Sequence, residues 1–318
     1  MKRFQHLHSV VRPGSAGIEI GPWRHPVAPK RDGYQTLVVD ILDTEGLRRM
    51  ARKRDVPEEE IALIEEVDIV GDASHLLDLV RLSGFTGRVR WIVSSHNFEH
   101  LPDPVRFLCD CEQLLEPGGT LAMIVPDKRY TFDRFQPAAT VADMLHSRIA
   151  GPGSDDLAWS SFRQQSLACL RVDTTGGRKL SWSTERNDPS LLRAKDPRRA
   201  LAILREDLAA GAAQPEFHGH RWRFTPAVFE LIVLDLRAMG FISMEAETFP
   251  ADGVEFSVLL RTCPPWNPSS DEYVAKRSAL CLRIEDESAR VTAAFAGLER
   301  ELEAARAELA KLRAAGGA

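Results

Sequence analysis

The sequence is poor in cysteine, and its cysteines form no recognisable pattern. The five cysteines of the 318-residue chain are Cys109, Cys111, Cys169, Cys263 and Cys281. No C-x-x-C pair or zinc-ligand spacing occurs among them. An odd number fits no complete disulfide framework, so we expect reduced thiols and a cytoplasmic protein.

Long apolar runs and an excess of positive charge are also missing. Residues 1–11 lack the apolar segment of a secretory signal, and no later stretch is apolar over the length needed to cross a bilayer. The formal net charge of −5 argues against broad electrostatic binding to nucleic acid or anionic lipid. We therefore expect a protein that binds no nucleic acid and does not insert into membranes.

Several catalytic motifs are absent as well. The chain has no P-loop, no nucleophile elbow and no G-x-G-x-x-G loop. These absences are consistent with a reaction that needs no covalent machinery. They also count against a nicotinamide-dependent oxidoreductase, because Pro22 and Trp23 follow the glycine where that loop would continue.

What the sequence does contain is a strand–helix–strand unit over residues 91–130. Residues 91–93 and 121–125 are apolar runs typical of buried strands. An Asp-Pro pair at 103–104 opens the helix between them, and E-P-G-G at 116–119 ends it. Such a unit crosses over right-handedly, so both strands run parallel and their carboxyl ends share one edge of the sheet.

Polar side chains follow both of these strands. They are Ser94, Ser95, His96, Asn97, Glu99 and His100 after the first, and Asp127, Lys128, Arg129 and Tyr130 after the second. Ligands of open α/β sheets bind at the carboxyl edge, so we expect the functional site there.

Two further strands are predicted nearer the amino end of the chain. Residues 18–20 run into Gly21, and residues 37–39 run into Asp40. An acid about twenty residues after the glycine is placed to accept both hydroxyls of a ribose. Asp40 is therefore predicted to be a ribose ligand, with a plain helix N-cap as the alternative.

Three phrases of the sequence resemble one enzyme family. They are GIEIG at 17–21, SHNFEHLPDP at 95–104 and LLEPGGTLAMIVPDKRYTFD at 114–133. They are similar to class I S-adenosylmethionine (SAM) dependent methyltransferases, and more narrowly to bacterial members associated with polysaccharide biosynthesis. The resemblance covers roughly residues 14–262.

The resemblance implies an α/β fold with a Rossmann-like, seven-stranded, mostly parallel sheet of order 3-2-1-4-5-7-6. The last two strands would be an antiparallel pair over residues 241–249 and 254–261. SAM is the implied cofactor. The implied cofactor-binding residues are Glu19, Gly21, Asp40, Asp72, Ser95, His96 and Asn97.

Some of these residues have a second interpretation. Asp72 matches the family's adenine-binding acid by position, but an Asx turn before the next helix is nearly as good an explanation. Asp127, Arg129 and Tyr130 are predicted to bind substrate, and the alternative for Arg129 and Tyr130 is that they anchor the segment that follows. A metal shared by Asp127 and a histidine has no support from ligand spacing, and we predict no metal site.

A hydroxyl acceptor would require a base, and histidine titrates closest to neutral pH. The candidates are His96, His100, His218 and His220. The alternative for His100 is a hydrogen bond that holds its own turn.

The predicted organisation has six parts. They are an N-terminal arm (1–16), a SAM-binding core (17–132), a helical insertion or lid (133–224), the end of the core (225–262), a linker (263–279) and a coiled coil (280–313). Helices within the insertion are expected near 141–149, 161–170 and 197–210.

The coiled coil is predicted from a seven-residue repeat. Its seam positions include Cys281, Ile284, Ser288, Val291, Phe295, Leu298, Leu302, Ala305, Leu309 and Leu312. It would join copies of the chain or bind a partner helix. The alternative is one amphipathic helix folded back on the domain.

Together these features predict a SAM-dependent O-methyltransferase acting on a sugar, nucleotide-sugar or glycan, with a histidine base. The alternative is a non-catalytic scaffold of the same fold that recruits a partner through its coiled coil.

Overall fold

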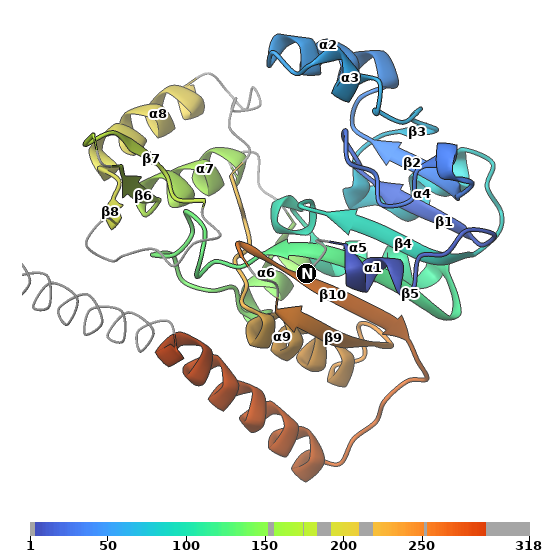
Figure 1. Cartoon of the computed structure of the whole chain (residues 1–318). Helices are drawn as coiled ribbons and strands as arrows, with labels where there is room; N and C mark the ends of the chain where they lie inside the picture. Colours follow the sequence, from blue (N-terminus) through green and yellow to red (C-terminus); the bar gives the residue numbers. More distant parts are fainter. Residues whose placement is uncertain are drawn as a thin grey trace, which may run out of the picture.

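The computed structural model describes residues 4–151, 156–173, 175–182, 192–209, 219–250 and 253–290. Seven strands form one sheet with the order β3-β2-β1-β4-β5-β10-β9 (Figure 1). They are β1 (Ala16–Ile20), β2 (Gln35–Asp40), β3 (Ile69–Val70), β4 (Val89–Ser95), β5 (Leu115–Pro126), β9 (Met244–Pro250) and β10 (Glu255–Thr262). Strands β1 to β5 pair in parallel, whereas β10 is antiparallel to both β5 and β9.

The strand labels differ from the predicted 3-2-1-4-5-7-6 at one end of the sheet. They differ because three short strands of the insertion, β6 to β8, come earlier in the chain than β9 and form a separate sheet. Within the large sheet alone, β9 and β10 are the sixth and seventh strands along the chain. The mixed, mostly parallel α/β sheet is thus confirmed, and its final hairpin places strand seven between strands five and six.

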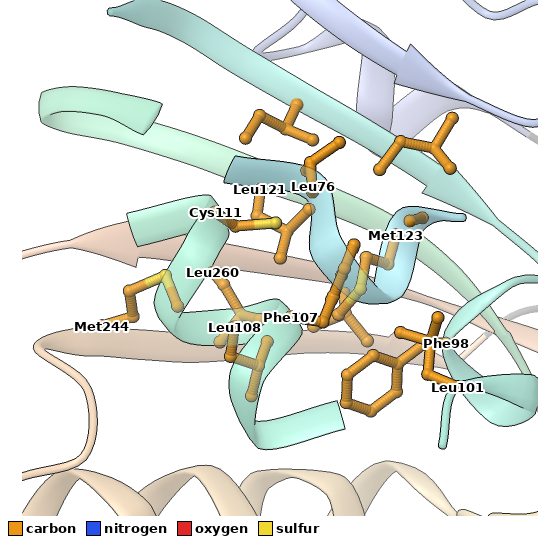
Figure 2. Close-up of a cluster of buried hydrophobic side chains, with 14 of the residues drawn as sticks. Leu76, Phe98, Leu101, Phe107, Leu108, Cys111, Leu121, Met123, Met244 and Leu260 are labelled. Atoms are coloured by element: carbon orange, nitrogen blue, oxygen red, sulfur yellow. The ribbon is translucent and has the colours of Figure 1, made fainter. Parts of the chain in front are cut away.

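Three helices cover one face of the sheet: α4 (Leu76–Leu82), α5 (Pro104–Leu114) and α9 (Pro226–Ala238). Figure 2 shows Leu108 and Cys111 of α5 beside Leu121 of β5 and Leu260 of β10, all fully buried. Burying a side chain of this size stabilises the fold by roughly 1.5–3 kcal/mol. This face therefore forms the main core.

The Asp-Pro pair starts α5 as predicted, and a second capping residue starts α9. The Asp103 carboxylate accepts the Arg106 N–H at 2.9 Å, and Pro104 occupies the first turn of α5. The Thr225 hydroxyl accepts the Val228 N–H at the start of α9. Local capping residues thus set where both helices start.

The other face is covered by the N-terminal arm. The arm contains the short helix α1 (Gln5–His8), and Leu7 and Val11 are buried against Trp91 of β4. Gly17 is the partner of Trp91 in the register of β1 and β4. A Cβ at Gly17 would lie 2.1 Å from the Trp91 ring, so the indole occupies the space that a side chain on β1 would need.

The connection from β1 to β2 has little regular structure. Residues 21–34, all of them described, contain only the 3₁₀ helix η1 (Lys30–Asp32). Prolines at positions 22, 26 and 29 remove backbone N–H donors and disfavour a helix there. A helix N-terminus therefore does not follow Gly21, unlike in common dinucleotide-binding sheets.

Beyond β2, two charge-rich segments form the helices α2 (Thr44–Lys53) and α3 (Glu58–Ile61). They form a small cluster of their own around Leu47 and Ile61, and Trp23 packs against it. The short 3₁₀ helix η2 (Ala73–His75) leads into α4. Trp23 thus contributes to the packing of α2 and α3.

The insertion after β5 is not purely helical, which corrects the prediction. It contains α6 (Val141–Ala150), α7 (Asp156–Ser166) and α8 (Pro197–Ala209), and also β6 (Cys169–Val172), β7 (Arg178–Leu180) and β8 (Leu192–Ala194). The three strands form a sheet of order β7-β6-β8, and Figure 1 shows it with α7 and α8 as a lobe beside the large sheet. Strands of three or four residues are too short to show a clear period of two, which is why the pattern missed them.

The chain beyond residue 269 forms a helix over residues 270–290 that packs against α9 (Figure 1). Buried Asp235 of α9 accepts hydrogen bonds from Tyr273 Oη at 2.8 Å and Arg277 Nε at 3.1 Å. Ile284, a predicted seam position, packs against the main core of the same chain. This part of the helix therefore follows the folded-back alternative.

The predicted seam from Val291 to Leu312 lies outside the described residues, so the coiled coil remains a prediction. Among the helices of the described part, none combines the length and apolarity that a membrane span requires.

Candidate functional site

Gly21 and Asp40 lie side by side at the carboxyl edge of the sheet. In the register of β1 and β2, Ile20 is the partner of Val39, and the Gly21 N–H donates to the Val39 carbonyl at 2.9 Å. Gly21 has a φ of 58°, which favours glycine. The half-buried Asp40 carboxylate accepts the Leu42 N–H at 3.3 Å, and burial raises its pKa. The structure therefore brings together the two residues predicted to flank a ribose.

Glu19, predicted to bind the cofactor, has partners within its own chain. Its carboxylate accepts the N–H groups of Val27 at 2.6 Å and Ala28 at 3.0 Å and is almost completely buried. Burial raises the pKa of Glu19 to about 7, although these two hydrogen bonds oppose the shift. Glu19 thus holds the connection between β1 and β2 in place, and its role towards a cofactor stays a prediction.

The raised pKa of Glu19 predicts a pH-dependent stability. The folded value is about 7 and the ordinary value is 4.5, so the folded state binds more protons than the unfolded state between these pH values. The free energy of unfolding should then fall by up to about 3 kcal/mol as the pH rises through this window. Denaturant unfolding from pH 4.5 to 7.5 measures this slope.

A Glu19→Gln variant should lose most of that slope, because the amide does not titrate. Glu59→Gln, at an exposed position of α3, is the matched control and should keep the slope. Equal slopes in wild type and Glu19→Gln would contradict the assignment.

Asp72 follows β3 at the same edge. Its carboxylate accepts the Ser74 N–H at 2.8 Å and so forms the Asx turn that begins η2, in line with the alternative interpretation. Burial lowers the pKa of Arg221, and the charge of Asp72 partly offsets that effect. Asp72 thus has a local structural role, and contact with adenine remains a prediction.

The loop after β4 places His96 between two acids. Its Nε2 lies 2.8 Å from Glu255 Oε2, and its Nδ1 lies 3.5 Å from Glu99 Oε1. Burial would lower the pKa of His96, but the hydrogen bond to Glu255 and the nearby Glu99 carboxylate outweigh it and raise the pKa to about 9. His96 is therefore charged at neutral pH and poorly suited to be a base.

Asn97 donates to Ser94 Oγ at 3.3 Å, and Ser95 ends β4.

Glu99 and His100 belong to the 3₁₀ helix η3 (Phe98–His100), which is fixed to the hydrophobic core by the residues on either side of this pair. Phe98 and Leu101 on either side are buried, as Figure 2 shows, and the Phe98 ring lies 5.6 Å from that of Phe224. Glu99 is only 1% exposed although it is charged. The burial of Phe98 and Leu101 thus sets the position of Glu99 and His100 at the edge of the sheet.

His220 reaches the same point from the end of the insertion. Its Nε2 lies 3.9 Å from Glu99 Oε1, and the His100 Nε2 lies 3.7 Å from the same oxygen. Burial would raise the pKa of Glu99, but His96 and the charges of His100 and His220 hold it at about 2. Three of the predicted histidines, His96, His100 and His220, therefore converge on one ionised carboxylate. His218 lies outside the described residues.

Asp133 orients His220 by contacting Nδ1, the ring nitrogen that does not face Glu99. Its Oδ2 lies 2.5 Å from His220 Nδ1, and both side chains are buried. The insertion also supplies Phe132, whose ring lies 4.8 Å from that of His220. The centre of the Trp182 ring lies 5.7 Å from that of His96, and the Trp182 residue is 45% exposed. An exposed indole thus stands next to the histidine group.

The predicted substrate residues are largely engaged with one another. Arg129 Nε donates to Asp127 Oδ1 at 2.9 Å, and Arg129 Nη1 donates to the Glu287 carbonyl of the last helix at 3.3 Å. The Arg129 guanidinium lies 5.4 Å from the centre of the Tyr130 ring. These contacts tie Arg129 to the end of β5 and to the last helix, and both substrate binding by these residues and anchoring of the insertion remain predictions.

The sequence predictions gave no specific role to four residues of this site, although Glu99 was placed among the polar residues of the carboxyl edge. The four residues are Glu99, Asp133, Trp182 and Glu255. Glu99 and Asp133 lie inside the phrases that carry the family resemblance, so their position within those phrases was the available signal. Trp182 and Glu255 carry no comparable signal, because only the fold brings them to this edge.

No family model matches the chain, and no curated protein matches it. Solved structures that it is similar to include the CcbJ methyltransferase from Streptomyces caelestis, at 15% identity and a TM-score of 0.40, over 81% of this chain and 92% of that one. A SAM dependent methyltransferase from Aquifex aeolicus has 12% identity and a TM-score of 0.37, over 81% and 88%. A possible histamine N-methyltransferase from Thermotoga maritima has 11% identity and a TM-score of 0.31, over 81% and 87%. Similarities this weak do not indicate which reaction this chain performs. The proposed reaction is inferred from the residues of the chain itself.

Proposed function

We propose that this protein is a SAM-dependent methyltransferase that methylates a hydroxyl of a sugar, nucleotide-sugar or glycan. The observation that carries the proposal is the adjacent placement of Gly21 and Asp40 at the carboxyl edge, with the polar loop after β4 on the neighbouring strand. This edge, between β1 and β4, is where the strand order reverses and where open α/β sheets bind ligands.

The proposed role of Asp40 is to accept the two ribose hydroxyls. Its described hydrogen bond comes from a backbone N–H, and its burial disfavours the charged form. Hydroxyl donors from a ribose would stabilise the carboxylate, and such charge-assisted hydrogen bonds are the stronger kind. Gly21 would let the cofactor approach the backbone closely.

Methyl transfer from a sulfonium is a single displacement. The acceptor oxygen attacks the methyl carbon, and the S–CH₃ bond breaks with its electron pair remaining on sulfur. The protein has to align the two groups and provide a route for the hydroxyl proton. Because His96 is already charged, we assign the activation of the hydroxyl to the group formed by Glu99, His100 and His220.

The acceptor class is supported by the insertion. The partly exposed Trp182 ring has its centre 6.3 Å from that of His220, and an aromatic ring next to charged side chains suits a sugar ring, which has both C–H and O–H groups. The sequence resemblance to enzymes of polysaccharide biosynthesis agrees with that choice.

Titration calorimetry of the whole chain with SAM and with S-adenosylhomocysteine tests the proposal. We expect dissociation constants in the micromolar range, which correspond to a binding free energy of about −8 kcal/mol. A screen with radiolabelled SAM over sugars and nucleotide-sugars should then show label transfer. Absence of binding to both compounds would overturn the proposal in favour of a non-catalytic scaffold.

A further inference from the structure

We propose that Glu99, His100 and His220 together bind one divalent first-row transition metal ion. Each residue offers one ligand atom, and these atoms all lie within 4.8 Å of one another. One carboxylate and two imidazoles are a common set of protein ligands for catalytic zinc and for other ions of this series.

The distances suit a shared ion after an adjustment of the side chains. Glu99 Oε1 lies 3.7 Å from His100 Nε2 and 3.9 Å from His220 Nε2. A tetrahedral ion with bonds of about 2.1 Å would place its ligand atoms roughly 3.4 Å apart. The two distances to Glu99 therefore need to shorten by a few tenths of an ångström, and the distance between the two imidazole nitrogens, which is within 4.8 Å, by up to about 1.4 Å.

The Glu99 side chain provides an independent argument for a cation. It is 1% exposed, and neither carboxylate oxygen has a hydrogen-bond partner among the described residues. Its nearest described cationic group is His96 Nδ1 at 3.5 Å, which is beyond a normal hydrogen bond. A buried carboxylate without hydrogen bonds is costly, and a directly bound metal ion would remove that cost.

The hydrogen bonds of both histidines favour metal binding. His220 Nδ1 faces Asp133 at 2.5 Å, and His100 Nδ1 faces the Gly219 carbonyl at 3.4 Å. If each Nδ1 carries the proton, each Nε2 presents its lone pair towards Glu99. Metal-bound histidines in proteins usually have such an acceptor behind the ring.

The two halves of the proposed site are also joined through the backbone. The Glu99 carbonyl accepts the N–H of Arg221 at 2.7 Å and of Trp222 at 3.1 Å. Trp222 Nε1 donates to the Leu101 carbonyl at 2.6 Å. These bonds hold His220 at a constant distance from η3, as a preorganised site requires.

The role of the ion rests on the proposed function. The three ligands lie at the edge where the acceptor hydroxyl must be, and a catalytic ion retains an open position for such an oxygen. The bound hydroxyl would lose its proton more readily, and the proton would pass to solvent water. His100 and His220 would then act as metal ligands, and the ion would replace a free imidazole base.

Cobalt binding to the whole chain tests the site without any measurement of activity. Protein stripped with a chelator is titrated with Co²⁺, and the visible absorption of the bound ion is followed. We expect one equivalent to bind, Zn²⁺ to displace it, and Mg²⁺ to leave the spectrum unchanged, because imidazole ligands select transition ions. A featureless titration would overturn the proposal.

Variants separate this site from chance binding elsewhere. Glu99→Gln and His100→Asn should each weaken Co²⁺ binding at least about a hundredfold, and Asp133→Asn about tenfold. His146→Asn, at an exposed position of α6, is the matched control and should bind as wild type does. Unchanged affinity in both Glu99→Gln and His100→Asn, with native circular dichroism, would refute the assignment.

Failure of the metal site and failure of the proposed function give different results. SAM binding to the metal-free protein tests Gly21 and Asp40 alone. Metal binding without SAM binding would keep the site and reject the methyltransferase. SAM binding without metal binding would keep the methyltransferase and reject the metal site. The role of base would then belong to a free histidine.

Discussion

A Gly17→Ala variant is expected to lose about 3 kcal/mol or more of its free energy of unfolding. The added Cβ would lie 2.1 to 2.2 Å from atoms at the fused bond of the Trp91 indole, which cannot swing away as the end of a flexible chain can. Trp91 is fully buried beneath the N-terminal arm, and its Nε1 donates to Ser15 Oγ at 3.1 Å. Denaturant unfolding at constant pH measures the loss.

The physical cause can be isolated with a double-mutant cycle. Trp91→Leu alone should destabilise the protein by leaving a cavity, because it removes a large buried ring. In the Gly17→Ala background the same change should cost much less, since it also relieves the clash. If the two losses simply add, contact between residues 17 and 91 is not the reason for the glycine.

An Asp40→Ala variant is expected to bind SAM about a hundredfold more weakly than wild type. A hydrogen bond to a charged group contributes about 1.5–3 kcal/mol, and 2.7 kcal/mol corresponds to a factor of one hundred. Asp40 ends β2 at the edge of the sheet, and its described hydrogen bond links it to Leu42 in the next turn. Calorimetry with SAM gives the affinity of each variant.

Asp32→Ala, an exposed position in the connection between β1 and β2, is the control and should bind SAM as wild type does. Asp40→Asn keeps the shape of the side chain and should fall between wild type and Asp40→Ala. If Asp40→Ala folds normally and binds with unchanged affinity, another residue holds the ribose.

The elements of the large sheet could be predicted because their signals are local. Apolar runs marked β2, β4 and β5, and the caps Asp103 and Thr225 marked the starts of α5 and α9. The meeting of Gly21 and Asp40 also followed from sequence, because parallel strands bring their carboxyl ends to one edge.

The partners of buried charges could not be predicted in this way. The carboxylate of Glu19 accepts the N–H groups of Val27 and Ala28, and that of Asp127 pairs with Arg129. The sequence predicted neither contact, and the cofactor and substrate roles of these two acids remain predictions. In both cases the partner lies close in the chain, and only the path of the backbone decides whether the two groups meet.

By itself, the sequence determined the parallel strand–helix–strand unit, the edge that carries polar side chains and the residues that begin the helices, because each depends on spacing and on local backbone preference. The order of the seven strands was implied by the family resemblance. Tertiary structure alone decided that Glu99 and His100 of η3 meet His220 from the end of the insertion and Asp133 from its start. The physical reason is that these groups are distant in the chain. Their convergence depends on how the insertion folds back over the sheet, and no local pattern encodes that path.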